Sequence, residues 1–174
     1  MTDFVEGLKI RKVRKRDLLE LSRVYAQIYR KHDVGERWSA PAAQKMLGWY
    51  LKSTPDLAYL AEYKGKIVGG FFVVLKPYWD GNHLIEGEIF VHPGYQKRGI
   101  GSMLMERVLA RSIKKHNAIV WEPFVFSWDY PLKWYRSLGF KKAGNRGLIS
   151  IVGNTRKVLK GLEVADNDRN LASP

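Results

Sequence analysis

The 174-residue sequence contains no cysteine, which excludes a disulfide framework and any metal site built on thiolates. Its four histidines, at positions 32, 83, 92 and 116, show none of the spacings typical of metal ligands, so we expect no metal. No apolar run approaches the roughly 20 residues that a helix needs to cross a bilayer, and the amino terminus lacks the pattern of a signal peptide. These absences favour a cytoplasmic protein without a membrane partner.

Acidic residues are scarce beside basic ones: 17 Asp and Glu stand against 30 Lys and Arg, a formal net charge of +13. This excess favours anionic partners such as phosphorylated cofactors or nucleic acid, although it also fits a basic solvated surface. With 45% hydrophobic residues, the chain suffices for one domain with a sizeable core. We expect a single domain over residues 1–162 and a polar, flexible tail over 163–174.

Apolar periodicity predicts an α/β protein of the α+β type. The predicted strands are 8–13, 57–63, 67–74, 84–91, 119–126, 140–142 and 148–152. Four helices are predicted. The first begins at a capping-box-like pair, Asp17 and Glu20, and the other three begin near Ser39, at Ile100 and at Tyr130. A hairpin signal at Lys64-Gly65 favours antiparallel neighbours, while the strand, helix and strand between 84 and 126 imply one parallel crossover. We therefore expect a mixed, mostly antiparallel sheet of six to seven strands, flanked by helices.

The segment Gln96–Ser102 follows a predicted strand directly and opens a predicted helix. Gly99 and Gly101 let the backbone approach a ligand, and the helix N-terminus adds its dipole to unpaired N–H groups. Lys97 and Arg98 add two positive charges. These features predict a phosphate-binding turn; the alternative is an ordinary strand-to-helix turn with a solvated basic pair.

Three motifs resemble, in order and spacing, the GNAT superfamily of N-acetyltransferases. They are Val91-His92-Pro93, Gln96-x-x-Gly99-x-Gly101 and Trp134-Tyr135-x-x-Leu138-Gly139-Phe140. The resemblance implies a sheet that splays after the fourth strand, with acetyl-CoA in the cleft. The cofactor-binding residues that it implies are Ile89, Phe90 and Val91, whose backbone pairs with the pantetheine arm, and the turn of Gln96, Lys97, Arg98, Gly99, Ile100, Gly101 and Ser102, which holds the pyrophosphate.

The resemblance also implies that Tyr135 is the general acid that protonates the departing thiolate; the alternative is a core aromatic residue beside Phe140. Members of the family often have Asn seven residues before this Tyr, where this sequence has Trp128.

Glu86 and Glu88 are the candidate general bases. An alkyl ammonium with a pKa of ~10.4 must lose a proton before it attacks a thioester, at a cost near 4.6 kcal/mol at pH 7. The two carboxylates stand two residues apart on a predicted strand, so both share one face with Phe90. One of them is expected to accept the proton, directly or through water. The alternative is a pair of solvated carboxylates.

We therefore expect an N-acetyltransferase that acts on a primary amine of a small molecule or a protein, by direct attack in a ternary complex with acetyl-CoA. The competing interpretation is a non-catalytic module that binds acyl-CoA or, through its basic surface, nucleic acid. Aromatic segments at 77–80, 121–124 and 128–130 are expected to flank the acceptor pocket. The sequence leaves open whether the protein forms a homodimer.

Overall fold

The structure is a computed structural model that describes residues 7–31, 36–125 and 130–141. The chain falls into two compact units, residues 1–125 and 126–174. The predicted strand at 148–152, the predicted domain boundary at 162 and the predicted tail all lie outside the described residues.

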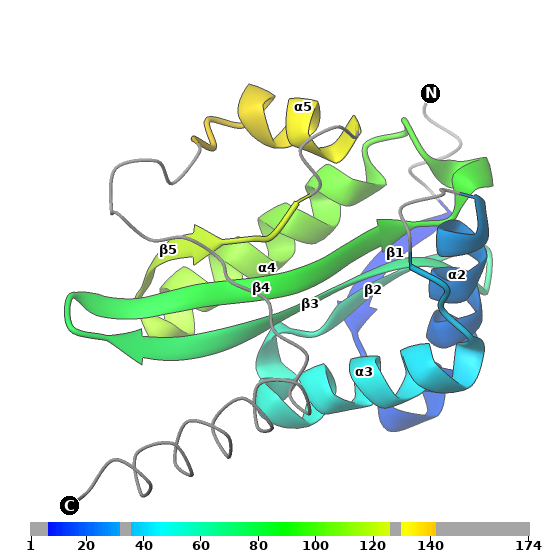
Figure 1. The fold of residues 1–174 in the computed structure, drawn as a ribbon, viewed down its shortest axis with the longest axis horizontal. Coiled ribbons are helices and arrows are strands. Elements are labelled where there is room, and N and C mark those ends of the chain that lie inside the picture. Colours follow the sequence, from blue (N-terminus) through cyan, green and yellow to red (C-terminus); the bar gives the residue numbers. More distant parts are fainter. Residues whose placement is uncertain (1–6, 32–35, 126–129, 142–174) are drawn as a thin grey trace, which may run out of the picture. The chain divides into compact units, whose positions relative to one another are not determined.

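The first unit is built on a five-stranded sheet whose strands follow each other in chain order (Figure 1). The strands are β1 (Leu8–Lys12), β2 (Tyr59–Tyr63), β3 (Lys66–Tyr78), β4 (Gly81–Val91) and β5 (Ala118–Glu122). The first four pair antiparallel, and β5 pairs parallel with β4. The mixed, mostly antiparallel sheet is confirmed. The described residues form five strands against the six to seven predicted, and Phe140 and Lys141 of the predicted 140–142 strand are not in a strand.

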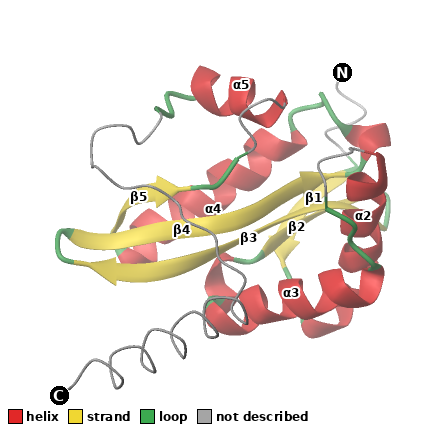
Figure 2. Ribbon diagram, in the orientation of Figure 1, coloured by secondary structure: helices red, strands yellow, loops and turns green. Residues whose placement is uncertain are grey.

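Helices cover both faces of this sheet (Figure 2). The helices α2 (Leu18–Lys31) and α3 (Ala40–Ser53) pack together on one face, and α4 (Ile100–His116) lies on the other (Figure 1). Short 3-10 helices are η1 (Lys15–Asp17), η2 (Pro55–Leu57) and η3 (Pro93–Tyr95). No helix in the described part of the chain has the length and apolar character needed to span a membrane.

The two hairpins of the sheet differ in how well the sequence predicted them. Lys64 and Gly65 both have positive φ, 47° and 80°, as a two-residue hairpin turn requires, so the predicted β2–β3 turn is confirmed. The β3–β4 hairpin extends further than predicted, because pairing continues to Tyr78 and Gly81. Most of the turn-rich stretch 77–82 therefore belongs to strands.

The helix starts are likewise confirmed at one site and corrected at another. Ser39 caps α3, with its hydroxyl accepting a 3.2 Å hydrogen bond from the N–H of Ala42. Asp17 and Glu20 do not form the predicted capping box. Asp17 instead ends η1 and accepts from the Arg14 N–H and the Arg11 guanidinium. Glu20 accepts from the N–H of Ile67, which ties α2 to β3.

Apolar periodicity predicts a buried stripe of Ile100, Met103, Leu104, Val108 and Leu109 along α4, and the observed stripe is rotated relative to it. Ile100, Leu104 and Val108 are buried as expected. Met105 and Ser112 complete the buried face, whereas the predicted Met103 and Leu109 are only half-buried. Periodicity identifies the helix, but the angle at which it meets a twisted sheet selects the residues at the edge of the stripe.

Candidate active site

The first feature of the site is the point where β4 loses its parallel neighbour. Pairing of β4 with β5 runs only from Asn82 to Ile85, which lies opposite Glu122. The indole N–H of Trp121 then donates a 2.8 Å hydrogen bond to the Glu86 carbonyl. Beyond it, residues 87–91 of β4 have no strand partner on this side within the described part of the chain. This is the splay that was expected after the fourth strand.

A β-bulge lies at the same point. Glu86 and Gly87 together stand opposite Val73, between the pairs Val74–Ile85 and Phe72–Glu88. Both bulged residues have positive φ, 56° and 119°. A side chain at Gly87 would also come within 3.0 Å of the Phe72 carbonyl oxygen. The bulge thus needs glycine at its second position, and it breaks the regular ladder beside the splay.

The end of β4 presents selected backbone groups to this open side. The N–H of His92 donates to the Val68 carbonyl, at 2.8 Å. Because bonded and non-bonded pairs alternate along an antiparallel ladder, Ile89 and Val91 direct their N–H and C=O groups away from β3. Phe90 directs its own toward β3. Of the three residues expected to pair with pantetheine, only Ile89 and Val91 therefore have suitable backbone geometry.

The turn after β4 is hydrogen-bonded to the end of that strand. The side-chain amide of Gln96 donates a 3.0 Å hydrogen bond to the Val91 carbonyl. Lys97 and Gly99 then adopt left-handed backbone conformations, with φ of 59° and 81°. Arg98, between them, lies over the ring of Tyr95 at 5.8 Å. The sequence Gln96–Gly99 thus forms a tight turn attached to the last residue of β4.

The same turn delivers open backbone donors. Gly99 is the N-cap of α4 and supplies no side-chain acceptor. The first ladder bond of the helix runs from Met103 N–H to the Gly99 carbonyl, so the helix provides no acceptor for the N–H groups of Ile100, Gly101 and Ser102. A Cβ placed on Gly99 would meet nothing within 4 Å, so space lies in front of the turn. This geometry fits an oxyanion or pyrophosphate.

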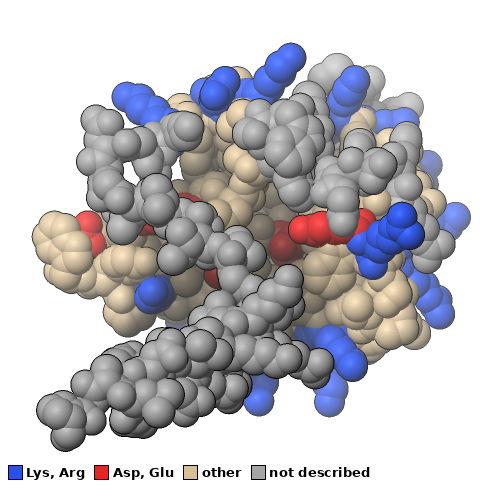
Figure 3. Space-filling view, in the orientation of Figure 1, with Lys and Arg blue, Asp and Glu red and all other residues tan. Residues whose placement is uncertain are grey.

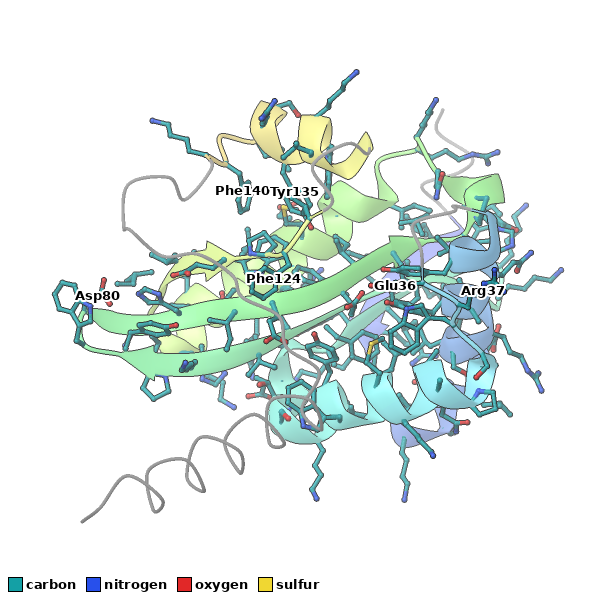
Figure 4. The ribbon with its side chains drawn as sticks, viewed as in Figure 1. Glu36, Arg37, Asp80, Phe124, Tyr135 and Phe140 are labelled. Carbon is teal, nitrogen blue, oxygen red and sulfur yellow. The ribbon has the colours of Figure 1, made fainter. Side chains whose placement is uncertain are left out.

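Three carboxylates gather beside the splay, and each is held by an aromatic donor. The Tyr25 hydroxyl on α2 donates to Glu88 at 2.8 Å, and the Tyr50 hydroxyl on α3 donates to Glu86 at 3.5 Å. Glu36, in the segment between these helices, accepts from the indole of Trp38 at 2.7 Å. Figure 4 labels Glu36 beside the right-hand part of β4. Figure 3 shows acidic atoms towards the middle of this face, with basic side chains around its rim.

The pKa of Glu88 is raised above the ordinary value of a glutamate. Burial raises its pKa to about 7; the hydrogen bond from Tyr25 opposes the increase, and the charges of Glu36 and Glu86 add to it. Burial also raises the pKa of Tyr25 and of Tyr50, so both phenols stay protonated and remain donors. A carboxyl group poised near neutral pH is suited to accept and release a proton.

The shared face predicted for Glu86, Glu88 and Phe90 is confirmed by their partners on α2 and α3. The ring of Phe90 meets that of Tyr25 edge to face, with centroids 5.1 Å apart. The prediction missed Tyr25 and Tyr50 as functional groups, because both lie on apolar helical stripes and resemble ordinary core residues. Their role as hydrogen-bond donors becomes apparent only when the carboxylates of β4 are placed opposite α2 and α3.

One of the aromatic segments expected around the acceptor pocket, the hairpin segment 77–80, lies away from the candidate site. Asp80 lies at the tip of the β3–β4 hairpin, about seven strand residues or roughly 20 Å from Glu88 (Figure 4). Trp121 is buried against Phe71 in the core. Phe124 is 78% exposed, and the segment from Trp128 lies outside the described residues. We therefore no longer assign the hairpin residues to the acceptor pocket.

The second unit contains α5 (Tyr130–Ser137), which ends as predicted at Gly139, with φ of 90°. Two hydrogen bonds, from Gly139 N–H to Arg136 and from Phe140 N–H to Tyr135, form a Schellman motif. The Tyr135 and Phe140 rings pack at 5.2 Å within it. The Leu138-Gly139-Phe140 motif therefore fixes the end of the helix and the ring of Tyr135, independently of any catalytic role.

Comparison with known proteins agrees with this fold. A family model described as the acetyltransferase (GNAT) domain matches residues 55–142. A curated relative, an uncharacterized N-acetyltransferase of Methanocaldococcus jannaschii, is 29% identical over 147 residues, 80% of this chain. The match spans 63% of that relative's length.

Two solved structures share the fold at low sequence identity. One is an aminoglycoside N-acetyltransferase in complex with CoA, with a TM-score of 0.64 and 20% identity over 86% of this chain and 95% of that one. The other is a protein of Salmonella typhimurium with acetyl-CoA, with a TM-score of 0.62 and 20% identity over 78% and 80% of the two chains.

A splayed mixed sheet with a basic, glycine-containing turn at the next helix defines the class of acetyltransferases of the GNAT type. The chain belongs to the acetyltransferase (GNAT) domain family.

Proposed function

We propose that this protein transfers the acetyl group of acetyl-CoA to a primary amine by direct attack in a ternary complex. The observation that carries the proposal is the position of Glu88, a half-buried carboxylate on the strand that splays from its neighbour, which accepts a hydrogen bond from Tyr25. An uncatalysed amine at neutral pH is almost fully protonated. A base at this position offsets that deficit.

Acetyl-CoA is the donor that the turn and strand suit. The open amides of Ile100, Gly101 and Ser102, with Lys97 and Arg98 beside them, offer hydrogen bonds and positive charge to the pyrophosphate. Ile89 and Val91 offer backbone groups to the amides of the pantetheine arm. Solved relatives of the same fold carry CoA or acetyl-CoA, which supports this choice.

The acceptor suits a site of carboxylates and aromatic rings. Glu36, Glu86 and Glu88 attract a cation locally, against the overall charge of +13. The rings of Tyr25 and Trp38 meet edge to face at 5.4 Å in the same region. Negative charge together with aromatic faces favours an alkyl ammonium through charge and cation–π contact.

In the proposed reaction, Glu88 takes a proton from the ammonium, and the free amine attacks the thioester carbon. The N–H of Val91, directed to the open side, stabilises the resulting oxyanion. The intermediate then collapses: the C–S bond breaks, the CoA thiolate is expelled, and the nitrogen releases its remaining extra proton to solvent. The hydroxyl of Tyr135 is assigned to protonate that sulfur.

The test is a panel of primary amines assayed for acetyl-CoA-dependent release of CoA, with Glu88→Gln and Glu86→Gln as a matched pair. Glu88→Gln should lower kcat by roughly 10²-fold at pH 7 and recover as pH rises and the amine deprotonates itself. Glu86→Gln should mainly raise the acceptor KM. Acetyl-CoA binding without turnover of any amine would favour the non-catalytic module instead. Equal pH profiles for both variants would remove Glu88 from the role of base.

A further inference from the structure

A cluster of basic side chains surrounds one carboxylate at the C-terminal end of α4. Asp56 of η2 accepts an ion pair from Lys12 of β1 at 2.8 Å and another from Lys115. The guanidinium of Arg111 and the imidazole Nε2 of His116 each lie 3.7 Å from the same carboxylate. Two elements far apart in the sequence, β1 and α4, thus bring three permanent positive charges and one imidazole to a single acid of η2.

The charges in this cluster do not balance. One carboxylate offsets one positive charge, so two of the three permanent charges remain in excess. The Lys12 and Lys115 side chains are about half exposed, at 47% and 48%, and are open to a ligand. Arg111 Nε and His116 Nε2 are buried atoms without a hydrogen-bond partner among the described residues. An unpartnered guanidinium donor and an unpartnered imidazole nitrogen beside excess positive charge are features of an anion site.

Stabilisation of the helix end accounts for only part of this arrangement. Basic residues in a last turn interact favourably with the helix dipole, and that explains Lys114, Lys115 and His116. It does not explain why Lys12, from an edge strand, and Arg111, a turn earlier, meet at the same carboxylate. The cofactor turn also lies at the opposite end of this 17-residue helix, about 25 Å away.

We propose that Lys12, Arg111, Lys115 and His116 form a second anion site, separate from the acetyl-CoA turn, that binds a phosphate group. The phosphate belongs either to a small phosphorylated molecule or to the backbone of a nucleic acid, since the two share the same tetrahedral oxyanion. Arg111 presents a planar donor fork, while the two lysines supply point charges. Asp56 keeps the cations together when the ligand is absent.

His116 provides a local reporter for this site. Burial lowers its pKa, and the neighbouring charges of Lys115 and Arg111 lower it further. Asp56 faces the imidazole at 3.7 Å, Lys12 pairs with the same carboxylate, and the side chain of Asn82 donates a 2.7 Å hydrogen bond to the His116 backbone carbonyl. A bound phosphate would oppose the effect of the cations and raise the pKa of His116.

The experiment is a titration of the full chain with sodium phosphate, followed by NMR of the histidine ring and the backbone amides, against sodium chloride at equal ionic strength. His116→Asn assigns the ring signal. Phosphate should shift the His116 signal saturably and raise its pKa, while chloride should not. Arg111→Gln and Lys115→Gln should each weaken phosphate binding by about tenfold.

Lys114→Gln is the matched control, since Lys114 is the exposed neighbour of Lys115 and is not among the partners of Asp56. It should leave phosphate binding unchanged. The inference is overturned if chloride acts as phosphate does, if Lys114→Gln weakens binding as much as Lys115→Gln, or if only the amides of residues 97–102 respond. Unchanged amide spectra of the variants away from the cluster establish that they fold.

A second arm identifies the source of the phosphate. A short single-stranded RNA should bind more tightly than inorganic phosphate if the ligand is a nucleic acid, and its salt dependence should weaken when Lys115 is neutralised. If the oligonucleotide binds no more tightly than inorganic phosphate does, the ligand is a small phosphorylated molecule. Either result is consistent with the proposed anion site and identifies the source of its phosphate.

Discussion

The hydroxyl of Tyr25 donates a 2.8 Å hydrogen bond to Oε2 of Glu88, and this bond links α2 to the strand at the splay. This hydrogen bond and burial shift the pKa of Glu88 in opposite directions. The bond favours the carboxylate and lowers the pKa of Glu88, whereas burial raises it to about 7. The phenol thus keeps the pKa of a half-buried acid within the range where the acid exchanges protons near neutral pH.

Tyr25→Phe keeps the ring and removes the donor. The pKa of Glu88 should then rise above about 7, and the acid limb of the kcat–pH profile should move upward by about one pH unit. The measurement is kcat for a confirmed amine between about pH 5 and 9, a range that brackets the pKa of about 7 of Glu88. Tyr59→Phe removes a hydroxyl from a buried tyrosine of β2 and should leave the profile in place. If the acid limb of the kcat–pH profile does not move in Tyr25→Phe, the hydrogen bond between Tyr25 and Glu88 plays no part in catalysis.

Glu88 should also make stability depend on pH. The folded protein holds a proton on Glu88 between its ordinary pKa of 4.5 and about 7, where the unfolded chain has released it. The folded state therefore binds more protons, and this group's contribution to the free energy of unfolding falls as pH rises through that window. The difference of about 2.5 in pKa corresponds to roughly 3 kcal/mol at most.

Glu88→Gln removes that titration. As pH rises from about 4 to about 8, the free energy of unfolding of the variant should therefore increase relative to that of the wild type, by up to roughly 3 kcal/mol. Urea denaturation at several pH values measures the difference. The exposed Glu106 supplies the control, because Glu106→Gln should track wild type throughout. A constant difference between Glu88→Gln and wild type would contradict the raised pKa.

Gly101→Asp should abolish or strongly weaken acetyl-CoA binding. The new carboxylate would stand among the open amides of the first turn of α4, where the pyrophosphate is proposed to bind. Calorimetry with acetyl-CoA measures the affinity. Gly101→Ala adds a methyl group without charge and favours the helix, so its loss should be much smaller. If a folded Gly101→Asp variant bound acetyl-CoA normally, the cofactor would have to bind elsewhere.

Tyr135→Phe should lower kcat by roughly 10²-fold with little change in acetyl-CoA affinity, as expected when a general acid is lost. The substitution keeps the ring that packs against Phe140 at 5.2 Å, so the Schellman end of α5 should survive. Steady-state kinetics and thermal unfolding separate the two effects. Phe140→Leu tests the packing alone and should lower stability more than kcat. Wild-type turnover in Tyr135→Phe would falsify the catalytic role and leave the motif a structural one.

The sequence predicted the local elements well, because each depends on neighbouring residues. The Lys64-Gly65 hairpin, the Ser39 cap, and the end of α5 at Gly139 all follow from backbone preferences within a few positions. The parallel crossover through α4 follows from the same kind of reasoning, since a strand, a helix and a strand leave few topologies. The motifs between Val91 and Phe140 were sufficient to indicate the family.

What the sequence could not determine depends on groups brought together from distant segments. Asp17 and Glu20 have the spacing of a capping box, yet Arg11 and the N–H of Ile67 compete for their carboxylates more effectively. Tyr25 has the position of a core residue, and only the placement of α2 over β4 turns it into a partner of Glu88.

The bulge at Glu86 and Gly87 is of the same kind. Periodicity of two in the sequence predicts a regular strand, whereas the register with Val73 is set by the pairing of two whole strands. The sequence by itself therefore determined the order of elements and the glycine-containing turn that precedes α4. The tertiary structure decided which carboxylate is desolvated by its neighbours, which phenol donates to it and where β4 loses its strand partner, because desolvation and strand register arise only when distant segments pack together.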